Sequence, residues 1–353
     1  MKIPTHVLVA PLNWGLGHAS RCVPIIHYFL DHGCKVSIAS DGNALQLLKE
    51  EFPDLEALEL NSGQVTYLPF GFFYYLKLIM HGFGLQKRAL SDEKHIEAFV
   101  KTHQVDLLIS DHRFGAFSEH IKSVVICHQL QFKAGLFSKG SSRFNAKNLN
   151  RYDEVWIPDT PESSNLSGVL SRSSAVKTPT QFIGILSRFR LLDLPKDIEY
   201  LAVISGPEPL RRMFEERLID SFKDQKSKKL VLVRGVYQQE PLTDLPNIKF
   251  YNHLKASALN ELICRSRIVI CRSGYSSVMD MACLGKQVFF VPTPHQGEQI
   301  YLAKRLEALK IAPYTDQSKF SLEDLKRLNH YPGFNPDDFQ KFPHQEFHQT
   351  WGE

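Results

Sequence analysis

A polar turn in the second half of the chain has the residue types of a phosphate-binding site. Ser273 and Gly274 follow an apolar run at 268–271 and precede apolar residues at helical spacing, so they join a strand to a helix. The unpaired N–H groups and the positive dipole end of a helix N-terminus favour an anion. Ser276 and Ser277 add two hydroxyls in the first helical turn. Alternatively, these two serines only cap a core helix.

Further features of this stretch fit a nucleotide. Asp280 lies later in the same helix, where a carboxylate suits ribose hydroxyls better than phosphate. A second apolar run at 288–291 completes a βαβ unit with parallel strands, whose ligands bind at the carboxyl ends of the strands. The polar residues after this second strand are therefore binding candidates: His295, Gln296, Gly297, Glu298 and Gln299. A solvated Asp280 that binds no ligand is the alternative.

Residues 271–299 resemble the C-terminal nucleotide-sugar signature of the family 28 glycosyltransferases, the MurG-like enzymes. The resemblance implies that an acid in the helix, here Asp280 where the family usually has Glu, binds the ribose of a nucleotide-sugar donor. It also implies that a Gln pair after the second strand contacts the sugar or the diphosphate. Only Gln299 matches that pair, because Ile300 occupies the second place.

A glycine-rich turn near the start of the chain is a second candidate site. The predicted strand 6–10 leads into Gly15 and Gly17, which open a helix with His18 in its first turn. The next strand ends near Asp41, where a dinucleotide-binding fold keeps its ribose-binding acid. This pattern by itself also fits an NAD-dependent dehydrogenase.

The same turn resembles the first glycine-rich loop of family 28 enzymes, G-x-G-H, and NWGLGH is especially similar to a group of uncharacterised MurG-related glycosyltransferases. The resemblance implies that Gly15 and Gly17 face the donor phosphates and that Asn13 and Trp14 face the acceptor. It places His18 at the reacting atoms. The alternative is a histidine that only caps a helix.

An acid at the end of another strand is a partner candidate for His18. Asp111 follows the predicted strand 105–109, and in related UDP-glycosyltransferases an acid near this place orients the catalytic histidine. We expect a His18–Asp111 dyad in which the carboxylate stabilises the imidazolium and so raises the basicity of the ring. Asp111 could instead cap the strand. His112 and Arg113 are the nearest substitutes, and both are acceptor-site candidates.

A later strand, 123–127, ends at HQLQ, which resembles the H-E-Q-N segment that meets the acceptor in family 28. His128 is kept, whereas Gln129 and Gln131 replace the acid and the asparagine. The resemblance therefore implies acceptor contacts from His128 and Gln131, and an acceptor other than the family's lipid.

Other donor candidates come from the linker and the second βα series. FIGILSR resembles the family linker and implies a phosphate contact from Arg188, which could equally be a plain surface arginine. Ser205 and Gly206 keep a phosphate-binding turn, but two prolines remove N–H donors there, and we expect Glu208 to supply a hydrogen bond instead. Two residues are expected to flank the base: Tyr251 and Leu254.

Composition limits the class of protein. The 353 residues are 43% hydrophobic and 23% charged, which predicts two domains of a globular protein, and the net charge of +4 is too small to favour nucleic acid as a partner. The six cysteines form no C-x-x-C pair and predict reduced, buried thiols. The chain begins directly with a strand, which predicts a cytoplasmic protein without a signal peptide. The aromatic stretch 67–85 favours peripheral contact with the inner face of a membrane.

These interpretations converge on an α/β protein of the GT-B class, with two Rossmann-like, doubly wound domains that face a cleft. We expect an N-terminal acceptor domain at 1–182, a C-terminal donor domain at 183–330 and a tail at 331–353 that packs on the N-terminal domain. The expected reaction moves a sugar, UDP-linked, to a hydroxyl acceptor that can be lipid-linked, with inversion and with no metal or cofactor. The alternatives are a dehydrogenase, a nucleotide-sugar epimerase and an inactive nucleotide-sugar binder.

Overall fold

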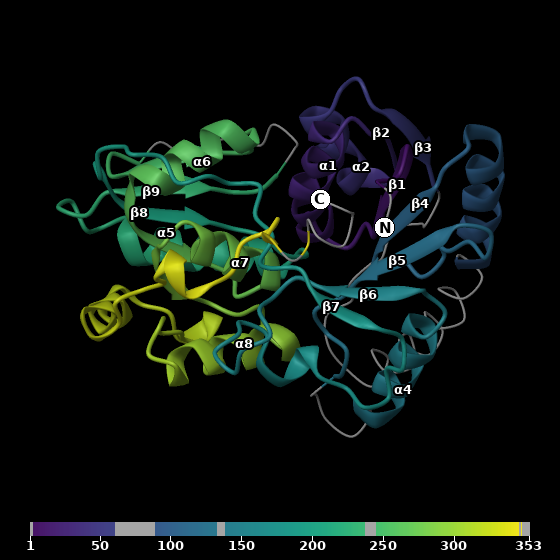
Figure 1. The fold of residues 1–353 in the computed structure, drawn as a ribbon. Helices are drawn as coiled ribbons and strands as arrows, with labels where there is room; N and C mark the ends of the chain where they lie inside the picture. The colour runs from purple at the N-terminus through teal and green to yellow at the C-terminus, as the bar shows by residue number, and fades with distance from the viewer. Residues whose placement is uncertain (1–2, 61–88, 133–137, 237–244, 346, 348–353) are drawn as a thin grey trace. The chain divides into compact units, whose positions relative to one another are not determined.

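The computed structural model describes residues 3–60, 89–132, 138–236, 245–345 and 347. The chain forms two compact units (Figure 1). Unit 1 comprises Met1–Glu162, Val169–Leu186 and Lys341–Glu353, and unit 2 comprises Ser163–Gly168 and Ser187–Gln340. The main boundary thus falls after Leu186, four residues beyond the expected position at 182, and the C-terminal tail is divided between the units at Gln340.

Unit 1 contains a parallel sheet of seven strands in the order β3-β2-β1-β4-β5-β6-β7. The order reverses between β1 and β4, and this reversal is the topological switch point where ligands of open α/β sheets bind. The strands are β1 (His6–Pro11), β2 (Lys35–Ser40), β3 (Glu56–Glu59), β4 (Leu107–Asp111), β5 (Lys122–Ile126), β6 (Glu154–Ile157) and β7 (Thr180–Phe182).

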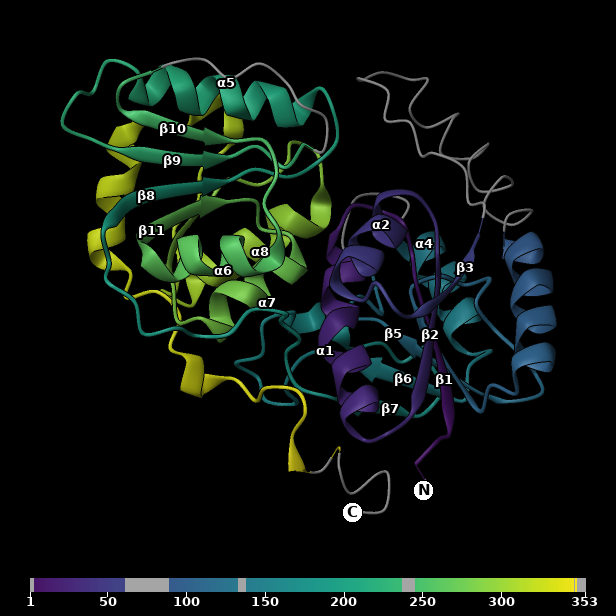
Figure 2. The same cartoon turned by 90° about the horizontal axis from the view of Figure 1, so that it is seen from above.

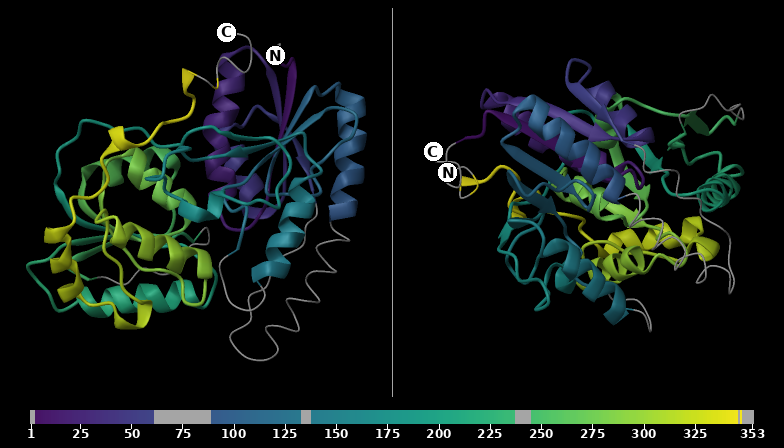
Figure 3. Two further views of the ribbon diagram at one scale, coloured as in Figure 1. Left: turned by 60° about the horizontal axis from the view of Figure 1, so that its bottom comes forward. Right: turned by 90° about the vertical axis from the view of Figure 1, so that its right-hand side faces the viewer.

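Helices cover both faces of this sheet. Helix α1 (Gly17–Asp31) lies on one face and the helical residues 89–103 lie on the other (Figure 3). Ile96 and Phe99 of the latter segment pack in one buried cluster with Leu8 of β1. The remaining helices of the unit are α2 (Gly42–Glu51), α4 (Ser138–Leu149) and the 3₁₀ turn η1 (Gly168–Ser171).

Unit 2 contains a parallel sheet of five strands in the order β10-β9-β8-β11-β12, and β10, β9, β8 and β11 can be followed side by side in Figure 2. Its switch point lies between β8 and β11. The strands are β8 (Ile198–Val203), β9 (Leu230–Val233), β10 (Ile248–Tyr251), β11 (Ser266–Cys271) and β12 (Gln287–Phe290). The helices are α5 (Leu210–Phe222), α6 (Ala256–Arg265), α7 (Tyr275–Cys283), α8 (Gly297–Ala308), η2 (Gln317–Lys319), η3 (Leu322–His330) and η4 (Pro336–Asp338).

The core of unit 2 shows why the polar stretch after 320 still folds. Phe214 of α5, Phe289 of β12 and Phe320 belong to one buried cluster, which also includes Leu325 and Leu328 of η3. Burial of these apolar side chains stabilises the unit by roughly 1.5–3 kcal/mol per side chain relative to exposure. The segment from Phe320 to His330 therefore covers the sheet as part of the core.

The expected α/β class with two doubly wound, Rossmann-like sheets is confirmed. The cleft between the domains stays a prediction. Two short elements, η1 and β7, lie in the stretch 163–182, which is rich in Ser and Thr. The expected membrane-contact stretch 67–85 lies outside the described residues.

The C-terminal tail lies in both units. Gly333 and Pro336 pack against the turn and strand at Gly285–Gln287 in unit 2. From Lys341 the chain belongs to unit 1, where His344 Nε2 lies 3.1 Å from the carbonyl oxygen of Phe182. Phe347 of the tail is fully buried.

Two further findings concern the cysteines and the question of a membrane-spanning helix. All six cysteines are free and buried. No helix in the described part of the chain is both long and apolar enough to span a bilayer.

Candidate active site

The switch point of unit 1 brings His18 and Asp111 together. Asp111 is the last residue of β4 and pairs in register with Pro11 at the end of β1, and His18 lies in the first turn of the helix that follows β1. His18 Nδ1 lies 2.9 Å from Asp111 Oδ1. Asp111 is completely buried, whereas the side chain of His18 is 18% exposed. Within the described residues, the second ring nitrogen of His18, Nε2, has no hydrogen-bond partner.

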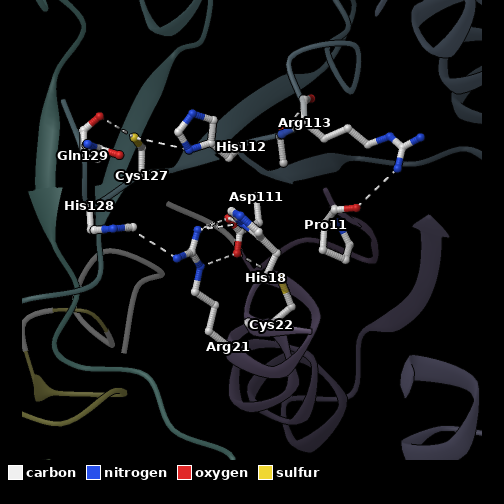
Figure 4. Close-up of polar contacts among 12 residues, drawn as sticks. Pro11, His18, Arg21, Cys22, Asp111, His112, Arg113, Cys127, His128 and Gln129 are labelled. Atoms are coloured by element: carbon white, nitrogen blue, oxygen red, sulfur yellow. Dashed lines mark hydrogen bonds and ion pairs between the residues drawn. The ribbon is translucent and has the colours of Figure 1, made fainter. Parts of the chain in front are cut away.

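A third residue, Arg21, joins this pair (Figure 4). Its Nε donates to Asp111 Oδ2 at 2.5 Å and its Nη2 donates to Asp111 Oδ1. The same Nη2 lies 2.9 Å from His18 Nδ1, and Nη1 lies 3.3 Å from Nδ1 of His128. Arg21 is 3% exposed, so a buried cation holds the carboxylate on which the expected dyad depends.

The electrostatics of the cluster differ from the expectation. Burial lowers the pKa of His18, the charge of Arg21 lowers it further, and Asp111 offsets these effects only in part. Burial alone would raise the pKa of Asp111, but the charges of Arg21 and His18 hold this pKa well below its ordinary range. Asp111 thus raises the pKa of His18 as expected, but burial and the charge of Arg21 together outweigh this effect.

Two further histidines lie near this site, of which His128 is buried and His112 is half-buried. The ring centroid of His112 lies 6.0 Å from that of His18, and burial together with the charges of His18 and Arg21 lowers the pKa of His112 to about 3. His112 Nδ1 lies 3.8 Å from Cys127 Sγ. The structure thus places His112 next to His18, and His128 next to Arg21.

Arg113 and Asn13, both acceptor candidates, have structural contacts instead. Arg113 is 2% exposed, and its guanidinium binds Asp41 at 2.7 Å and Asp92 at 2.9 Å. Asn13 donates to the other oxygen of Asp41 and accepts from the N–H of Ala44. Assignment of Arg113 to the acceptor is corrected on this geometry, because a buried arginine between two carboxylates is not available to a ligand. Asp41 itself is also engaged at both oxygens, which disfavours a ribose contact of the dehydrogenase type.

The remaining candidates of unit 1 lie around the same edge. Trp14 is 50% exposed, and the loop at Gly15, with φ of +68°, has open space where a side chain would lie. Gly17 is the first residue of α1. The side chain of Gln131 donates to the carbonyl of Val169 at 2.6 Å, so it ties its loop to η1.

The switch point of unit 2 joins Ser205 and Gly206 with Ser273 and Gly274. These pairs follow β8 and β11, whose last residues are adjacent in register. Gly206 has a φ of +115°, which favours glycine. Between the two turns lies Arg272, which is 1% exposed, and burial lowers its pKa to about 9.

Arg272 ties the strand ends of unit 2 together. Its Nη1 donates to the carbonyl of Val291 at 3.0 Å and its Nη2 donates to that of Leu210 at 3.1 Å. Its Nη2 also donates to Gln317 Oε1 at 2.6 Å. The buried cation thus adds positive potential behind the turn where a phosphate is expected.

The N-terminus of α7 has the expected form of an anion site. Gly274 is the extended residue before Tyr275, the first helical residue, and the half-buried Ser276 and Ser277 lie in the first turn. Ser273 Oγ donates to the carbonyl of Gln299 at 2.9 Å, and Gln299 Oε1 accepts from the N–H of Thr293 at 2.8 Å. These bonds fix the loops after β11 and β12 relative to each other. His295 and Gln296 are exposed, and half-buried Gly297 and Glu298 begin α8.

Asp280 lies in the same helix with an unusual protonation equilibrium. Ser187 Oγ donates to Asp280 Oδ1 at 2.6 Å. Burial raises the pKa of Asp280 to about 7, and this hydrogen bond and the charge of Arg188 limit the rise. A carboxyl group that titrates near neutrality can accept hydrogen bonds from ribose hydroxyls at pH 8 and donate one at pH 6.

Glu208 lies just before α5 and has partners in the first turn of that helix. It pairs with Arg211 Nε and accepts from the N–H of Arg212 at 3.3 Å, and its side chain is 51% exposed. The structure therefore gives Glu208 contacts at the start of α5, and its contact with the donor stays a prediction. Tyr251 and Leu254 are half-buried at and just after the end of β10.

Sequence reasoning missed Arg21, Ser187 and Thr293. The signal for Arg21 is its position three residues after His18, which puts both on one face of α1. Ser187 precedes the Arg188 of the linker and gave no signal of its own. Thr293 is buried, and its hydroxyl has no partner among the described residues. In the same part of the chain, no three His, Cys, Asp or Glu side chains gather as metal ligands would.

Comparison with known proteins gives similarities in sequence and in structure. Residues 208–329 match the Glycosyltransferase family 28 C-terminal domain. The chain is 29% identical over 135 residues to the UDP-N-acetylglucosamine--N-acetylmuramyl-(pentapeptide) pyrophosphoryl-undecaprenol N-acetylglucosamine transferase of Sulfurihydrogenibium sp. (strain YO3AOP1). That alignment spans 38% of this chain and 38% of the relative.

Solved structures share the fold over most of both chains. The spinosyn rhamnosyltransferase SpnG has a TM-score of 0.65 at 16% identity, with 93% of each chain covered. The UDP-GlcNAc 2-epimerase of Neisseria meningitidis, bound to UDP-GlcNAc, has a TM-score of 0.61 at 12% identity, with 94% of this chain and 95% of that chain covered. At these identities the likeness concerns the fold alone, which is the GT-B fold.

Proposed function

We propose that this chain, whose residues 208–329 carry a family 28 glycosyltransferase C-terminal domain within a GT-B fold, is a glycosyltransferase. It moves a sugar from a nucleotide diphosphate sugar, UDP-linked, to a hydroxyl acceptor that can be lipid-linked, with inversion at the sugar carbon. Unit 2 binds the donor and unit 1 binds the acceptor. The proposed enzyme is cytoplasmic and works without a metal or cofactor.

The observation that carries the donor half is the combination of the α7 N-terminus and Asp280 on one helix. The helix N-terminus with Ser276 offers N–H groups and a hydroxyl to a diphosphate, and buried Arg272 adds positive charge behind it. Asp280 lies further along α7, where it can meet the ribose. The departing diphosphate gains negative charge during transfer, and fixed donors at this position stabilise that charge.

The acceptor half of the proposal rests on His18. A neutral imidazole whose Nδ1 donates to Asp111 has a lone pair on Nε2, and Nε2 belongs to a side chain that is partly exposed. Such a nitrogen can remove the proton of an acceptor hydroxyl as that oxygen attacks the sugar carbon. The bond from this carbon to the diphosphate breaks on the opposite side, so the configuration inverts.

Donor binding is tested by calorimetric titration of the full chain with UDP, GDP, dTDP and NADH. We expect UDP to bind best, and Asp280→Ala to weaken UDP binding at least tenfold because a charge-assisted hydrogen bond contributes about 1.5–3 kcal/mol. Asp220→Ala is the matched control, since Asp220 lies on the surface of α5 with 63% of its side chain exposed. Tight NADH binding without UDP binding would contradict the proposal and favour the dehydrogenase.

Turnover separates the remaining alternatives. Incubation with UDP-sugars and a panel of hydroxyl acceptors should give a glycoside in wild type and none in His18→Ala, while both bind UDP alike. Isomerised donor in the absence of any acceptor would indicate the epimerase activity named for one structural neighbour. UDP binding with no product from any donor and acceptor would indicate an inactive binder.

A further inference from the structure

Arg21 occupies the centre of the cluster at the switch point of unit 1. Three of its nitrogens contact three different residues: Asp111 through Nε and Nη2, His18 through Nη2, and His128 through Nη1. A buried arginine with both carboxylate oxygens of Asp111 is a bidentate pair, which fixes the geometry of the acid. The acid in turn fixes the ring of His18.

Arg21 and Asp111 compete for the same nitrogen of His18. Both Asp111 Oδ1 and Arg21 Nη2 lie 2.9 Å from Nδ1. When Nδ1 carries the proton it donates to Asp111, and Nε2 is left with its lone pair. When Nδ1 accepts from Arg21, the proton lies on Nε2. Protonation of both nitrogens would place an imidazolium beside the guanidinium, which the like charge disfavours.

The charged and titratable groups around His18 within unit 1 all bear on this balance. Arg21 and Cys22 come from α1, Asp111 and His112 from the end of β4, and Cys127 and His128 from the end of β5. Asp111 is the carboxylate of this set, and burial raises the pKa of the neighbouring Cys22 thiol well above its ordinary value. The single negative charge of Asp111 is matched by the single positive charge of Arg21.

We infer that Arg21 is a positioning residue that keeps the imidazole of His18 uncharged at neutral pH by neutralising Asp111 and by excluding a second cation from the cluster. The inference deepens the proposed function, since it rests on His18 as the base. An uncharged His18 is ready to accept a proton without first losing one, so it can act as a base at neutral pH.

The test is a direct titration of His18 by ¹⁵N NMR on histidine-labelled full-length protein, with the resonance assigned by its loss in His18→Gln. In wild type we expect His18 to titrate below the ordinary histidine pKa of 6.5. In Arg21→Gln the cation is gone while Asp111 remains, so the pKa of His18 should rise by one unit or more. Arg21→Lys keeps the charge and should titrate close to wild type.

Three outcomes bear on the inference. A folded Arg21→Gln protein, judged by circular dichroism, whose His18 titrates as in wild type would overturn it. Wild-type His18 that titrates at pH 6.5 or above would overturn it regardless of the variants, including the case in which Arg21→Gln does not fold. A rise in Arg21→Gln but not in Arg21→Lys would support it, because a purely structural arginine would affect folding and leave the titration unchanged.

The same spectra separate this inference from the proposed function. The ¹⁵N shifts report which ring nitrogen carries the proton. A neutral His18 with its proton on Nε2 leaves the role of Arg21 standing and contradicts the proposed role of His18 as a base. Conversely, if product forms and its rate falls at low pH equally in wild type and Arg21→Gln, the transferase function stands and the inference fails.

Discussion

At the scale of single residues, two opposing effects act on the charge of the Asp280 carboxyl group. Its place in a half-buried part of α7 disfavours the charged form, while one hydrogen bond from Ser187 and the charge of Arg188 favour it. The folded protein therefore binds a proton at Asp280 up to about pH 7, whereas an ordinary aspartate loses it near 3.8. Because the unfolded chain binds fewer protons in that window, stability falls as the pH rises from about 4 to 7.

Asp280→Asn should reverse this loss. The neutral amide still accepts from Ser187, so the variant should gain stability over wild type between pH 4 and pH 7 and keep a constant advantage above pH 7. Each unit of pKa shift corresponds to about 1.4 kcal/mol. Because solvent partly screens the partly exposed side chain, we expect a smaller gain, of roughly 2 kcal/mol in the free energy of unfolding. Urea unfolding at pH 5 and pH 8 measures it. Asp220→Asn, on the exposed face of α5, should show no such pH dependence.

The positions of His18 and Asp111 could be predicted because each lies at or just after the end of a strand, at the ligand edge of a parallel sheet, and that of Asp280 because its helix begins at such an edge. Arg21 could not, because an arginine within an amphipathic helix normally points to solvent. Its burial depends on Asp111, which is 90 residues away. Arg113 was assigned to the acceptor site because the sequence does not reveal its two buried partners. Asp41 and Asp92 bind its guanidinium, and both come from distant parts of the chain.

At the scale of elements, the turn after β4 packs directly on the helix at 89–103. A Cβ added at Gly115 would lie 2.5 Å from the carbonyl oxygen of Ala89 and 2.7 Å from Cβ of Asp92. Asp92 holds Arg113, which lies in the same turn. The absence of a side chain at Gly115 thus allows the helix, the ion pair and the strand end to meet.

Gly115→Ala should cost about 2–3 kcal/mol of unfolding free energy, because backbone cannot yield as a flexible side chain would. Gly33→Ala is the matched comparison in unit 1. Gly33 has a φ of +76° but open space around it, so only the backbone conformation is strained, at about 1 kcal/mol. Thermal unfolding of both variants distinguishes the two effects, and equal losses would contradict this account of the packing.

The sequence pattern predicts those strands that contain an apolar run. Strands β1 and β11 are of this kind, whereas β7 has only three residues, Thr180–Phe182, and two of them are polar. Its strand character comes from pairing with β6, whose register the pattern does not encode. Likewise η3 is polar overall, and only its contact with the core of unit 2 reveals Leu325 and Leu328 as buried.

At the scale of the whole molecule, the end of the chain contributes to the core of unit 1. The ring of Phe347 is fully buried, and its centroid lies 5.2 Å from that of Tyr28 and 5.1 Å from that of Trp156. The sequence of the tail does not show which of its residues belong to which unit. Phe334 and Phe347 are both phenylalanines in a polar stretch, but only Phe334 belongs to unit 2.

Phe347→Ala should therefore destabilise unit 1 by about 3–5 kcal/mol and leave UDP binding by unit 2 unchanged. Denaturant unfolding followed by circular dichroism measures the first effect, and calorimetry below the unfolding transition measures the second. Phe144→Ala is the control, since Phe144 is 50% exposed and should change stability by less than about 0.5 kcal/mol. Loss of UDP binding at full folding would show that the tail has a role beyond packing.

The burial of every native thiol makes this chain a convenient host for site-specific labels. Burial raises the pKa of the Cys34 and Cys271 thiols, which leaves little reactive thiolate at neutral pH. Two cysteines introduced at the exposed positions Phe144 and Met213 would be the only sites that a maleimide dye reaches in the folded protein. Energy transfer between such dyes, measured with and without UDP, then reports whether the distance between the two labels changes in an otherwise unaltered background.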